Sequence, residues 1–419
     1  MPACPDVDVA IIGAGAAGLA TAIFAKRRSP ALRVRVLDGA RSPGAKILVS
    51  GGGRCNVTNA AVTHADFNGG RPATVKQVLR ALPVPATIAF FRELGVTLHE
   101  EERGKLFPDS HRSRDVLDAL VRELERLGIE LRAGHRVMTV SRVDAGFAIE
   151  SSQGPLTSRA IVLATGGLAL PKTGSDGAGY GFAQQLGHTL VPTTPALVPL
   201  VAAAEAPRQF HARVSGVSQP VRLTVRAGDT PIARIDGPLL WTHFGISGPA
   251  ALDASRHWLR AELDGRSASL VADLAPGERF ETLEARWLDL ARQQPRMSIA
   301  RALGTMMPAS VADALSSAQA IDTDTTLATL TRDTRRALLH AIAAWPIAVT
   351  GSRGYSYAEV TAGGIALDEI DPRTMASRCC PGLYLVGEIL DVDGRLGGFN
   401  FQWAWSTAKV AGDALSLFA

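Results

Sequence analysis

Three glycines near the start of the chain have the spacing of a phosphate-binding turn. Gly13, Gly15 and Gly18 follow a short apolar run, residues 7–12, and precede a helical stretch, residues 19–28. In such a strand–turn–helix unit, Gly13 takes the tight turn, Gly15 leaves its backbone open to a pyrophosphate, and Gly18 lets the helix pack closely. The free N–H groups and the dipole at the helix start bind negative charge. The spacing therefore predicts dinucleotide binding.

An acidic residue at the end of the next strand supports this prediction. Residues 33–38 are expected to form that strand, and Asp38 stands 20 residues after Gly18. At this distance a carboxylate can bind the ribose hydroxyls of a dinucleotide. The alternative, a buried glycine-rich helix contact, does not explain the acid.

A second glycine-rich stretch covers residues 44–59. Its three consecutive glycines, Gly51–Gly53, allow the backbone to wrap closely round a ligand. Lys46 and Arg54 can offset phosphate charge, and Asn56 can hydrogen-bond a polar chain such as ribityl. A flexible surface loop is the alternative, but loops this rich in glycine and polar donors usually bind something.

The same strand-and-glycine pattern returns near the end of the chain. Residues 382–388 read as a strand with a glycine exit, and Gly397 and Gly398 then lead into a helix. A helix N-terminus here would stabilise the negative charge of a reduced flavin. Asn400 and Gln402 could donate hydrogen bonds to the pyrimidine side of the flavin ring.

No second glycine triplet of the dinucleotide type occurs in the sequence. A buried strand, residues 160–167, ends in a glycine turn, but the glycines at residues 174–179 have the wrong spacing. A separate NAD(P)H-binding domain is therefore not expected, and a nicotinamide donor would have to dock transiently. This separates the chain from enzymes of the glutathione-reductase type.

The cysteines and the composition point to a cytoplasmic globular protein. Cys55 has no second cysteine a few residues away, so it is expected to be packed or to contact the flavin, with a redox role as the alternative. The adjacent Cys379 and Cys380 could bridge only with strain, which favours a reducing compartment. The net charge of +4 permits an anionic partner without requiring one. No membrane span, secretory signal or metal site is expected.

The order of the elements suggests one domain interrupted by another. Expected elements, in chain order, are a helix over residues 74–94 interrupted at Pro83 and Pro85, a helix over 114–127, strands within 129–150, short strands between 192 and 275, and helices over 278–343 broken at Pro295 and Pro308. The middle region carries no nucleotide motif. We therefore expect residues 1–194 and 346–419 to form one domain, with residues 195–345 inserted into it.

Five motifs together resemble a known family. They are Gly13–Gly18, Lys46-Ile-Leu-Val-Ser-Gly-Gly-Gly-Arg-Cys-Asn-Val-Thr-Asn59, Thr242-His-Phe-Gly-Ile-Ser-Gly-Pro249, Val360-Thr-Ala-Gly-Gly364 and Gly387-Glu388 through Trp405. In this order they resemble the BaiN/YhiN-like flavoproteins, which are NAD(P)/FAD-dependent oxidoreductases, over nearly the whole chain. The resemblance implies an α/β, Rossmann-like fold of the two-dinucleotide-binding-domain type, with an inserted β-rich plus helical domain.

The resemblance also implies bound FAD and its contacts. The family's FAD motifs carry over onto Gly13, Gly15, Gly18, Asp38, Lys46, Arg54, Asn56, Thr165, Gly166, Gly387, Glu388, Gly398 and Asn400. Within the same motifs, the predicted cofactor set also takes in Ala16, Ala17, Gly53, Gly397 and Phe399. Val137 is added because its expected place in the topology would hand a backbone amide to adenine. Asp38 is shorter than the glutamate of many flavoproteins, which leaves its ribose contact open.

Substrate contacts are predicted from the insert and from one basic segment. His243 could donate a proton, because flavin reduction of a double bond needs a hydride at one carbon and a proton at the other. Alternatively, His243 only fixes a loop by hydrogen bonds. Residues 103–114 read as a basic loop, whose His111, Arg112 and Arg114 could form an anion-binding rim with Arg353. An ordinary solvated face is the alternative there.

The sequence therefore predicts an FAD-dependent oxidoreductase in the cytoplasm, with NAD(P)H as a transient donor. The resemblance points to reduction of a carbon–carbon double bond, since some relatives are linked to uridine reduction in ribosomal RNA and others to bile-acid dehydroxylation. The substrate is then RNA or a small molecule. Two alternatives stay open: a flavin-dependent dehydrogenase or oxidase of a small metabolite, and a flavin-bearing RNA-binding factor without turnover. The oligomeric state is left open.

Overall fold

The computed structural model describes residues 5–203 and 210–419, which form two compact units. Unit 1 combines the chain up to Thr193 with Glu359–Ala419, and unit 2 is Thr194–Ala358. The insert was expected to end at residue 345, but unit 2 runs further, because two strands after that point pair within its sheet. Among the described residues, no helix has the length and apolar character needed to cross a membrane.

Parallel strands from both ends of the chain build the central sheet of unit 1. Its core order is β22 (Leu383–Leu385), β10 (Gly154–Leu163), β1 (Val7–Ile12), β2 (Val34–Asp38) and β7 (Glu130–Ala133). Every residue of β1 is buried, as expected for a strand covered on both faces. The parallel order brings the carboxyl ends of these strands to one edge, where α/β sheets bind ligands.

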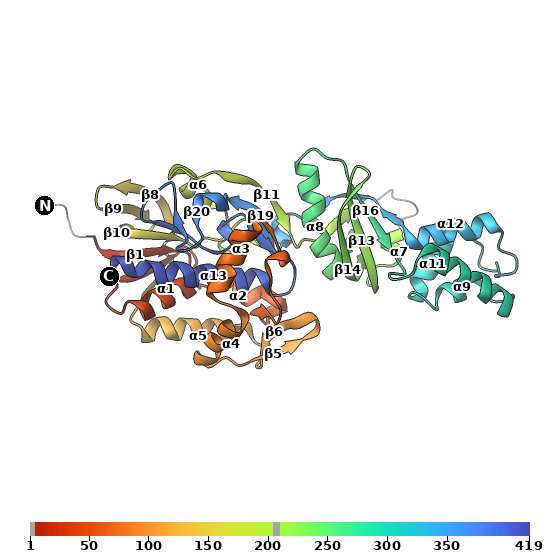
Figure 1. Ribbon diagram of the computed structural model, residues 1–419, viewed down its shortest axis with the longest axis horizontal. Helices are drawn as coiled ribbons and strands as arrows, with labels where there is room; N and C mark the ends of the chain where they lie inside the picture. The colour runs from red at the N-terminus through yellow and green to blue at the C-terminus, as the bar shows by residue number, and fades with distance from the viewer. Residues whose placement is uncertain (1–4, 204–209) are drawn as a thin grey trace. The chain divides into compact units, whose positions relative to one another are not determined.

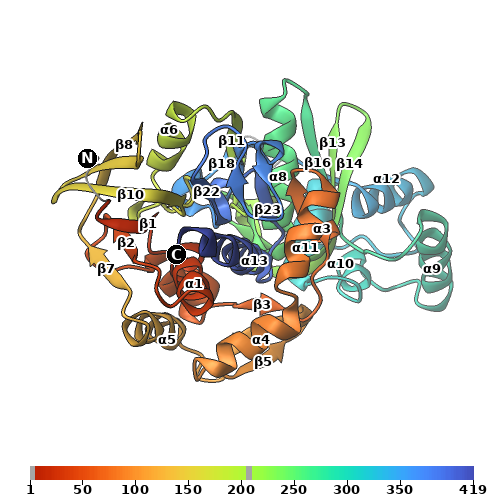
Figure 2. The ribbon, with the colours of Figure 1, turned by 60° about the vertical axis from the view of Figure 1, so that its left-hand side comes forward.

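Two helices from opposite ends of the sequence pack together in unit 1. Helix α1 (Ala16–Arg28) follows β1, and α13 (Phe399–Ala414) lies beside it, as Figures 1 and 2 show. Gly412 makes this approach possible, because a Cβ there would lie 2.6 Å from the Cβ of Phe24. The C-terminal segment therefore completes the domain that the N-terminal segment begins.

The remaining elements of unit 1 surround this core. They are α2 (Ala45–Val49), β3 (Thr58–Asn59), β4 (Phe67–Gly69), α3 (Pro72–Ala81), α4 (Val84–Glu93), β5 (Leu98–Glu101), β6 (Lys105–Pro108), α5 (Ser113–Arg126), β8 (Val137–Val143), β9 (Gly146–Ser151), α6 (Ala178–Gln185), β19 (Val360–Ile365), β20 (Ile370–Asp371), β21 (Ala376–Ser377) and β23 (Val392–Gly394). Strand β11 (Leu190–Ala196) leads into unit 2. The break between α3 and α4 at Pro83 and the position of α5 confirm the predicted helices. The predicted interruption at Pro85 is wrong, because Pro85 lies in the first turn of α4, where a proline is tolerated.

Unit 2 is a seven-stranded antiparallel sheet with helices inserted between its strands. The sheet order is β17 (Trp345–Ile347), β16 (Ala268–Asp273), β13 (Ser218–Ala227), β14 (Thr230–Thr242), β15 (Gly245–Ser247), β12 (Leu200–Ala202) and β18 (Val349–Ser352). Its helices are α7 (Phe210–Arg213), α8 (Gly248–Leu263), α9 (Phe280–Gln293), α10 (Ile299–Leu303), α11 (Ala309–Ala318) and α12 (Arg332–Ala343). Figure 2 shows α8 alongside β13 and β14. The predicted helix breaks at Pro295 and Pro308 are confirmed.

Candidate functional site

The three glycines of the first turn have two different roles: two of them allow close packing of the protein's own backbone, and one faces open space. A Cβ on Gly13, at φ +108°, would lie 2.4 Å from the Ala164 carbonyl oxygen, and one on Gly18 would lie 1.9 Å from that of Gly13. Gly13 and Gly18 are therefore glycines because the protein's own backbone needs the space. A Cβ on Gly15 would meet nothing within 4 Å. Gly15 precedes the first residues of α1, Ala16 and Ala17, so an anion can reach the free N–H groups there.

Asp38 fastens this turn to the end of β2. Its Oδ2 accepts a hydrogen bond from the Ala14 N–H at 2.7 Å, and its Oδ1 accepts one from the Ala40 N–H at 2.8 Å. A carboxylate has further lone pairs, so a ribose contact is compatible with both bonds and stays a prediction. The His135 N–H donates to the Asp38 carbonyl oxygen at 2.8 Å, which brings the start of β8 to the same place. Val137 begins β8 with a buried side chain, and its adenine contact also stays a prediction.

The exits of β10 and β22 reach the same edge of the sheet. The Ala164 N–H donates to the Ile12 carbonyl oxygen, which places Thr165 and Gly166 beside the first glycine turn. Gly387 follows β22 with φ +74°, and a Cβ there would lie 2.8 Å from that of Ala17 at the start of α1. These predicted residues are therefore brought together around the N-terminus of α1.

The second glycine loop has an unusual backbone and a buried polar atom. Gly51, Gly52 and Gly53 all have positive φ, at 55°, 68° and 84°, and Cys55 follows with φ 62°. Asn56 is 9% exposed, and within the described residues its Oδ1 is buried without a hydrogen-bond partner. An orphaned buried acceptor costs stability unless a ligand supplies a donor. The ring or ribityl donors of FAD fit this requirement.

The start of α13 lies against this loop. A Cβ on Gly398, at φ +92°, would lie 2.5 Å from the Thr58 carbonyl and 2.8 Å from the Asn56 Oδ1. Gly398 is therefore required for contact between two parts of the chain, and the first N–H groups of α13 lie near the orphaned acceptor. Gly397, also with positive φ, precedes it, and Phe399 is buried in the core.

Two amides at the start of α13 have mainly structural bonds. Asn400 accepts from the Gly394 N–H and donates to the Gly394 carbonyl, both at 2.8 Å, so its flavin contact stays a prediction. The expected contact of Gln402 with the flavin ring is wrong. Its Nε2 donates to the Leu82 carbonyl and to Ser406, its Oε1 accepts from the hydroxyls of Thr58 and Thr87, and the residue is 1% exposed.

Lys46 and Glu388 join the second glycine loop to the exit of β22. The Lys46 Nζ lies 2.5 Å from the Glu388 Oε2, and the Glu388 Oε1 accepts from the Thr361 N–H at 3.0 Å. The role of Thr361 was not predicted from the sequence. Its hydroxyl also accepts from the N–H groups of Leu168 and Ala169. Its place in the Val360–Gly364 motif was the available signal.

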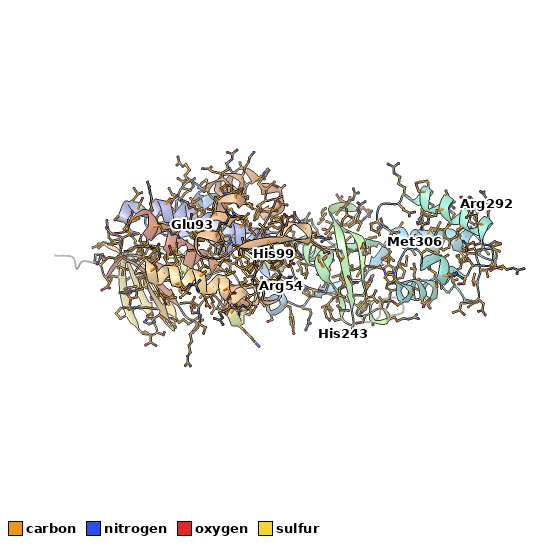
Figure 3. All side chains as sticks on the ribbon, turned by 90° about the horizontal axis from the view of Figure 1, so that it is seen from below. Arg54, Glu93, His99, His243, Arg292 and Met306 are labelled. Carbon is orange, nitrogen blue, oxygen red and sulfur yellow. The ribbon has the colours of Figure 1, made fainter. Side chains whose placement is uncertain are left out.

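Arg54 is directed toward the hairpin of β5 and β6. Its Nη1 donates to the Glu101 Oε1 at 2.7 Å, and its guanidinium lies 4.1 Å from the centre of the Phe107 ring. The charge of Arg54 is therefore already balanced by a carboxylate, and its phosphate contact stays a prediction. Figure 3 labels Arg54 and, close to it, His99 of β5.

Cys55 is fully buried as a free thiol. Burial raises its pKa to about 12, against a smaller lowering from a hydrogen bond with Ser50. A thiol that stays protonated is a poor nucleophile, which fits the packed interpretation rather than the redox one.

The predicted substrate residues lie at exposed positions in both units. The segment 103–114, expected to be a loop, contains β6 and the start of α5, because β6 pairs with β5. His111, Arg112 and Arg114 are all exposed around the start of α5. In unit 2, the Arg353 guanidinium lies 3.6 Å from the Tyr357 ring centre and 4.8 Å from that of Phe244.

His243 lies at the tip of a tight hairpin in unit 2. Thr242 of β14 pairs with Gly245 of β15, so His243 and Phe244 form the connecting turn. His243 is exposed there, and Figure 3 labels it at the end of these strands. The position leaves its imidazole accessible to a ligand.

Two bacterial enzymes match the chain at 34% identity over nearly the whole length. A ribosomal RNA dihydrouridine synthase of Escherichia coli is identical at 34% over 96% of both chains, and one of Haemophilus influenzae at 34% over 97% of this chain and 98% of its own. A 3-dehydro-bile acid delta(4,6)-reductase of Clostridium scindens is 31% identical over 97% of this chain and 98% of its own.

Solved structures share the fold. An Escherichia coli quinol fumarate reductase subunit has a TM-score of 0.50 and 15% identity, covering 98% of this chain and 70% of that chain. The HI0933-like protein Rossmann domain matches residues 7–414, which include the whole of unit 2 and all of unit 1 except its first six and last five residues. The chain therefore belongs to the HI0933-like family of Rossmann-domain proteins.

Proposed function

We propose that the protein reduces a uridine of ribosomal RNA to dihydrouridine, with FAD as its cofactor. At the coarser level it is an FAD-dependent oxidoreductase that reduces carbon–carbon double bonds. The observation that carries this function is the full-length similarity to two dihydrouridine synthases and to a bile acid delta(4,6)-reductase. The reductase is named for the reduction that it performs, and the two synthases are named for dihydrouridine, the product of reducing the carbon–carbon double bond of uridine.

The residues at the carboxyl edge of the sheet in unit 1 would hold FAD. The N-terminus of α1 at Gly15 would receive the pyrophosphate, and Asp38 the adenosine ribose. The orphaned Asn56 acceptor and the N-terminus of α13 would receive the flavin end. When bound, FAD supplies the hydride for the reduction.

The protein's own residues would then bind the substrate and supply a proton. The exposed Arg112, Arg114 and Arg353 would contact RNA phosphates, and His243 would donate the proton to the second carbon. NAD(P)H would dock transiently as the donor, since the sequence holds no second dinucleotide triplet. An enzyme with this substrate would act in the cytoplasm, which remains part of the proposal.

The test compares ribosomal RNA from cells with and without the gene. Loss of one dihydrouridine in the deletion strain, restored by the wild-type gene, is the expected result. The His243→Ala protein should restore it poorly while still binding FAD, and full restoration would remove His243 as the proton donor. Unchanged RNA modification in the deletion strain would overturn the RNA substrate and leave the small-molecule reductase as the surviving function.

Salt dependence separates these two substrates in vitro. Each phosphate contact steepens the fall of RNA affinity with salt concentration, so binding should weaken strongly between low and physiological salt. Replacing Arg112, Arg114 or Arg353 by glutamine should each remove about one phosphate contact, and so make the fall of log affinity with log salt concentration less steep by about one contact's share. A small apolar substrate would show little salt dependence.

A further inference from the structure

A cluster of histidines and carboxylates lies on the hairpin of β5 and β6 in unit 1. His99 and Glu101 are two residues apart on β5, so both side chains project from one face of the strand. His111 follows β6 and its ring lies 4.7 Å from the ring of His99, centre to centre. No metal site was predicted from the sequence, although the spacing of His99 and Glu101 was a signal for one.

The three side chains bring possible metal ligands together. The His99 Nε2 lies 3.4 Å from the Glu101 Oε1, and the His111 Nδ1 lies 3.8 Å from the same oxygen. One ligand atom from each of the three residues lies within 4.8 Å of those of the other two. A tetrahedral zinc ion with bonds of about 2.0–2.1 Å separates its ligand atoms by roughly 3.4 Å. The observed spacing therefore needs only small adjustments to accept the ion.

Neighbouring groups hold two of these ligands in position. The His99 Nδ1 lies 3.1 Å from the Asp109 Oδ1, so Asp109 can accept the Nδ1 proton and leave the Nε2 lone pair directed at Glu101. This carboxylate–histidine arrangement is the usual support of a metal-binding imidazole. Arg54 donates to the Glu101 Oε1 at 2.7 Å and orients that carboxylate.

The charge balance of the cluster also favours a cation. With neutral imidazoles, Glu101 and Asp109 outweigh the single charge of Arg54 and leave one net negative charge. His111 has φ 52°, a left-handed conformation that is uncommon for residues other than glycine.

We propose that His99, Glu101 and His111 bind one zinc ion, with Asp109 orienting His99 and water completing the coordination. The ion would tie the turn at His111 to β5. It would also hold Arg54, and therefore the end of the Gly51–Gly53 loop, through Glu101. In this arrangement His111 binds the metal rather than the substrate. The proposal goes beyond the proposed function and does not depend on it.

The test measures zinc binding to the full-length, FAD-loaded protein after chelator treatment. Zinc chloride would be titrated in competition with a fluorescent chelator, and bound metal counted by mass spectrometry. We expect the wild type to bind one zinc ion per chain. His111→Asn should bind zinc at least 100-fold more weakly, because asparagine accepts the left-handed backbone but removes the imidazole. Asp109→Asn should weaken binding by about 10- to 100-fold.

A matched control is His64→Asn, in the same unit outside the cluster, which should bind zinc like the wild type. Zinc should also raise the melting temperature of the wild type but not that of His111→Asn. Binding well below one equivalent, or equal binding by His111→Asn and the wild type, would overturn the proposal. Binding abolished by Cys379→Ser would overturn it too, since His188, Glu369 and Cys379 form a second cluster of possible ligands within residues 5–203 and 210–419.

Discussion

Adding one methyl group to two glycines of the first turn should have opposite consequences for folding and cofactor binding. Gly15 has φ −82° and open space where a Cβ would project, whereas the Cβ of Gly18 would lie 1.9 Å from the Gly13 carbonyl oxygen. The comparison keeps the chemistry of the change constant. It therefore separates a glycine needed for the ligand from one needed for the fold.

The magnitudes follow from the structure. Gly15→Ala should gain about 0.4–1 kcal/mol from lower unfolded-chain entropy and lose a similar amount because alanine caps a helix poorly. The apoprotein should therefore be as stable as the wild type within about 0.5 kcal/mol. Gly18→Ala forces backbone to move and should cost about 3 kcal/mol. In excess FAD, at 100 times its Kd, the wild type gains about 2.7 kcal/mol from binding.

The assay is urea unfolding of each protein with and without FAD, together with the flavin content after gel filtration. Without FAD, we expect Gly15→Ala to be as stable as the wild-type apoprotein. With FAD, Gly15→Ala should lose most of the FAD-dependent stabilisation, and Gly15→Val should lose all of it. Gly18→Ala should be destabilised in both states. An unstable Gly15→Ala apoprotein, or one that retains full FAD stabilisation, would refute the reasoning that Gly15 faces the pyrophosphate.

Three further outcomes test the supports of the site. Burial raises the Cys55 pKa to about 12 from 9.0, so the contribution of the protonated thiol to stability is complete below pH 9 and falls by about 1.4 kcal/mol per pH unit toward pH 12. The free energy of unfolding of Cys55→Ala should therefore fall less steeply with pH over that window than that of the wild type. Parallel plots of unfolding free energy against pH for the two proteins would contradict this. Gln402→Leu should cost about 3 kcal/mol in urea unfolding, because the Leu82 carbonyl and two threonine hydroxyls lose their partner, whereas an effect below 1 kcal/mol would mean that these groups find other partners. Glu388→Ala should destabilise the apoprotein by about 1–2 kcal/mol more than Lys46→Ala, because it also leaves the N–H of the buried Thr361 unpaired; equal losses would show that only the ion pair matters.

The sequence was most informative where one local segment carries the whole signal. The glycine turn at residues 13–18 and the helix break at Pro83 each depend on backbone rules that act within a few residues, and both follow the prediction. The return of a strand-and-glycine pattern near residue 383 correctly indicated a strand of the first sheet, since β22 pairs with β10. These features need no knowledge of distant partners.

The sequence was least informative where a side chain finds its partner far along the chain. Gln402 was expected to donate to the pyrimidine side of the flavin ring, but its bonds reach Leu82, Thr58 and Thr87, more than 300 residues away. Likewise, Arg54 offers a charge suited to phosphate, and only the β5–β6 pairing shows that Glu101 already neutralises it. Residue type predicts what a group can bind, but not which group reaches it first.

This dependence on distant partners has a consequence for how the site forms. Asn59 donates to the Gly397 carbonyl across 338 residues, and Lys46 meets Glu388 across 342. The orphaned Asn56 acceptor and the N-terminus of α13 therefore come together only once the C-terminal segment has docked beside α1. A ligand that contacts both the Gly15 turn and the N-terminus of α13 binds the assembled unit and not its separate parts. By mass action its binding energy then stabilises the docking itself, so cofactor loading and closure of the interrupted domain are coupled equilibria.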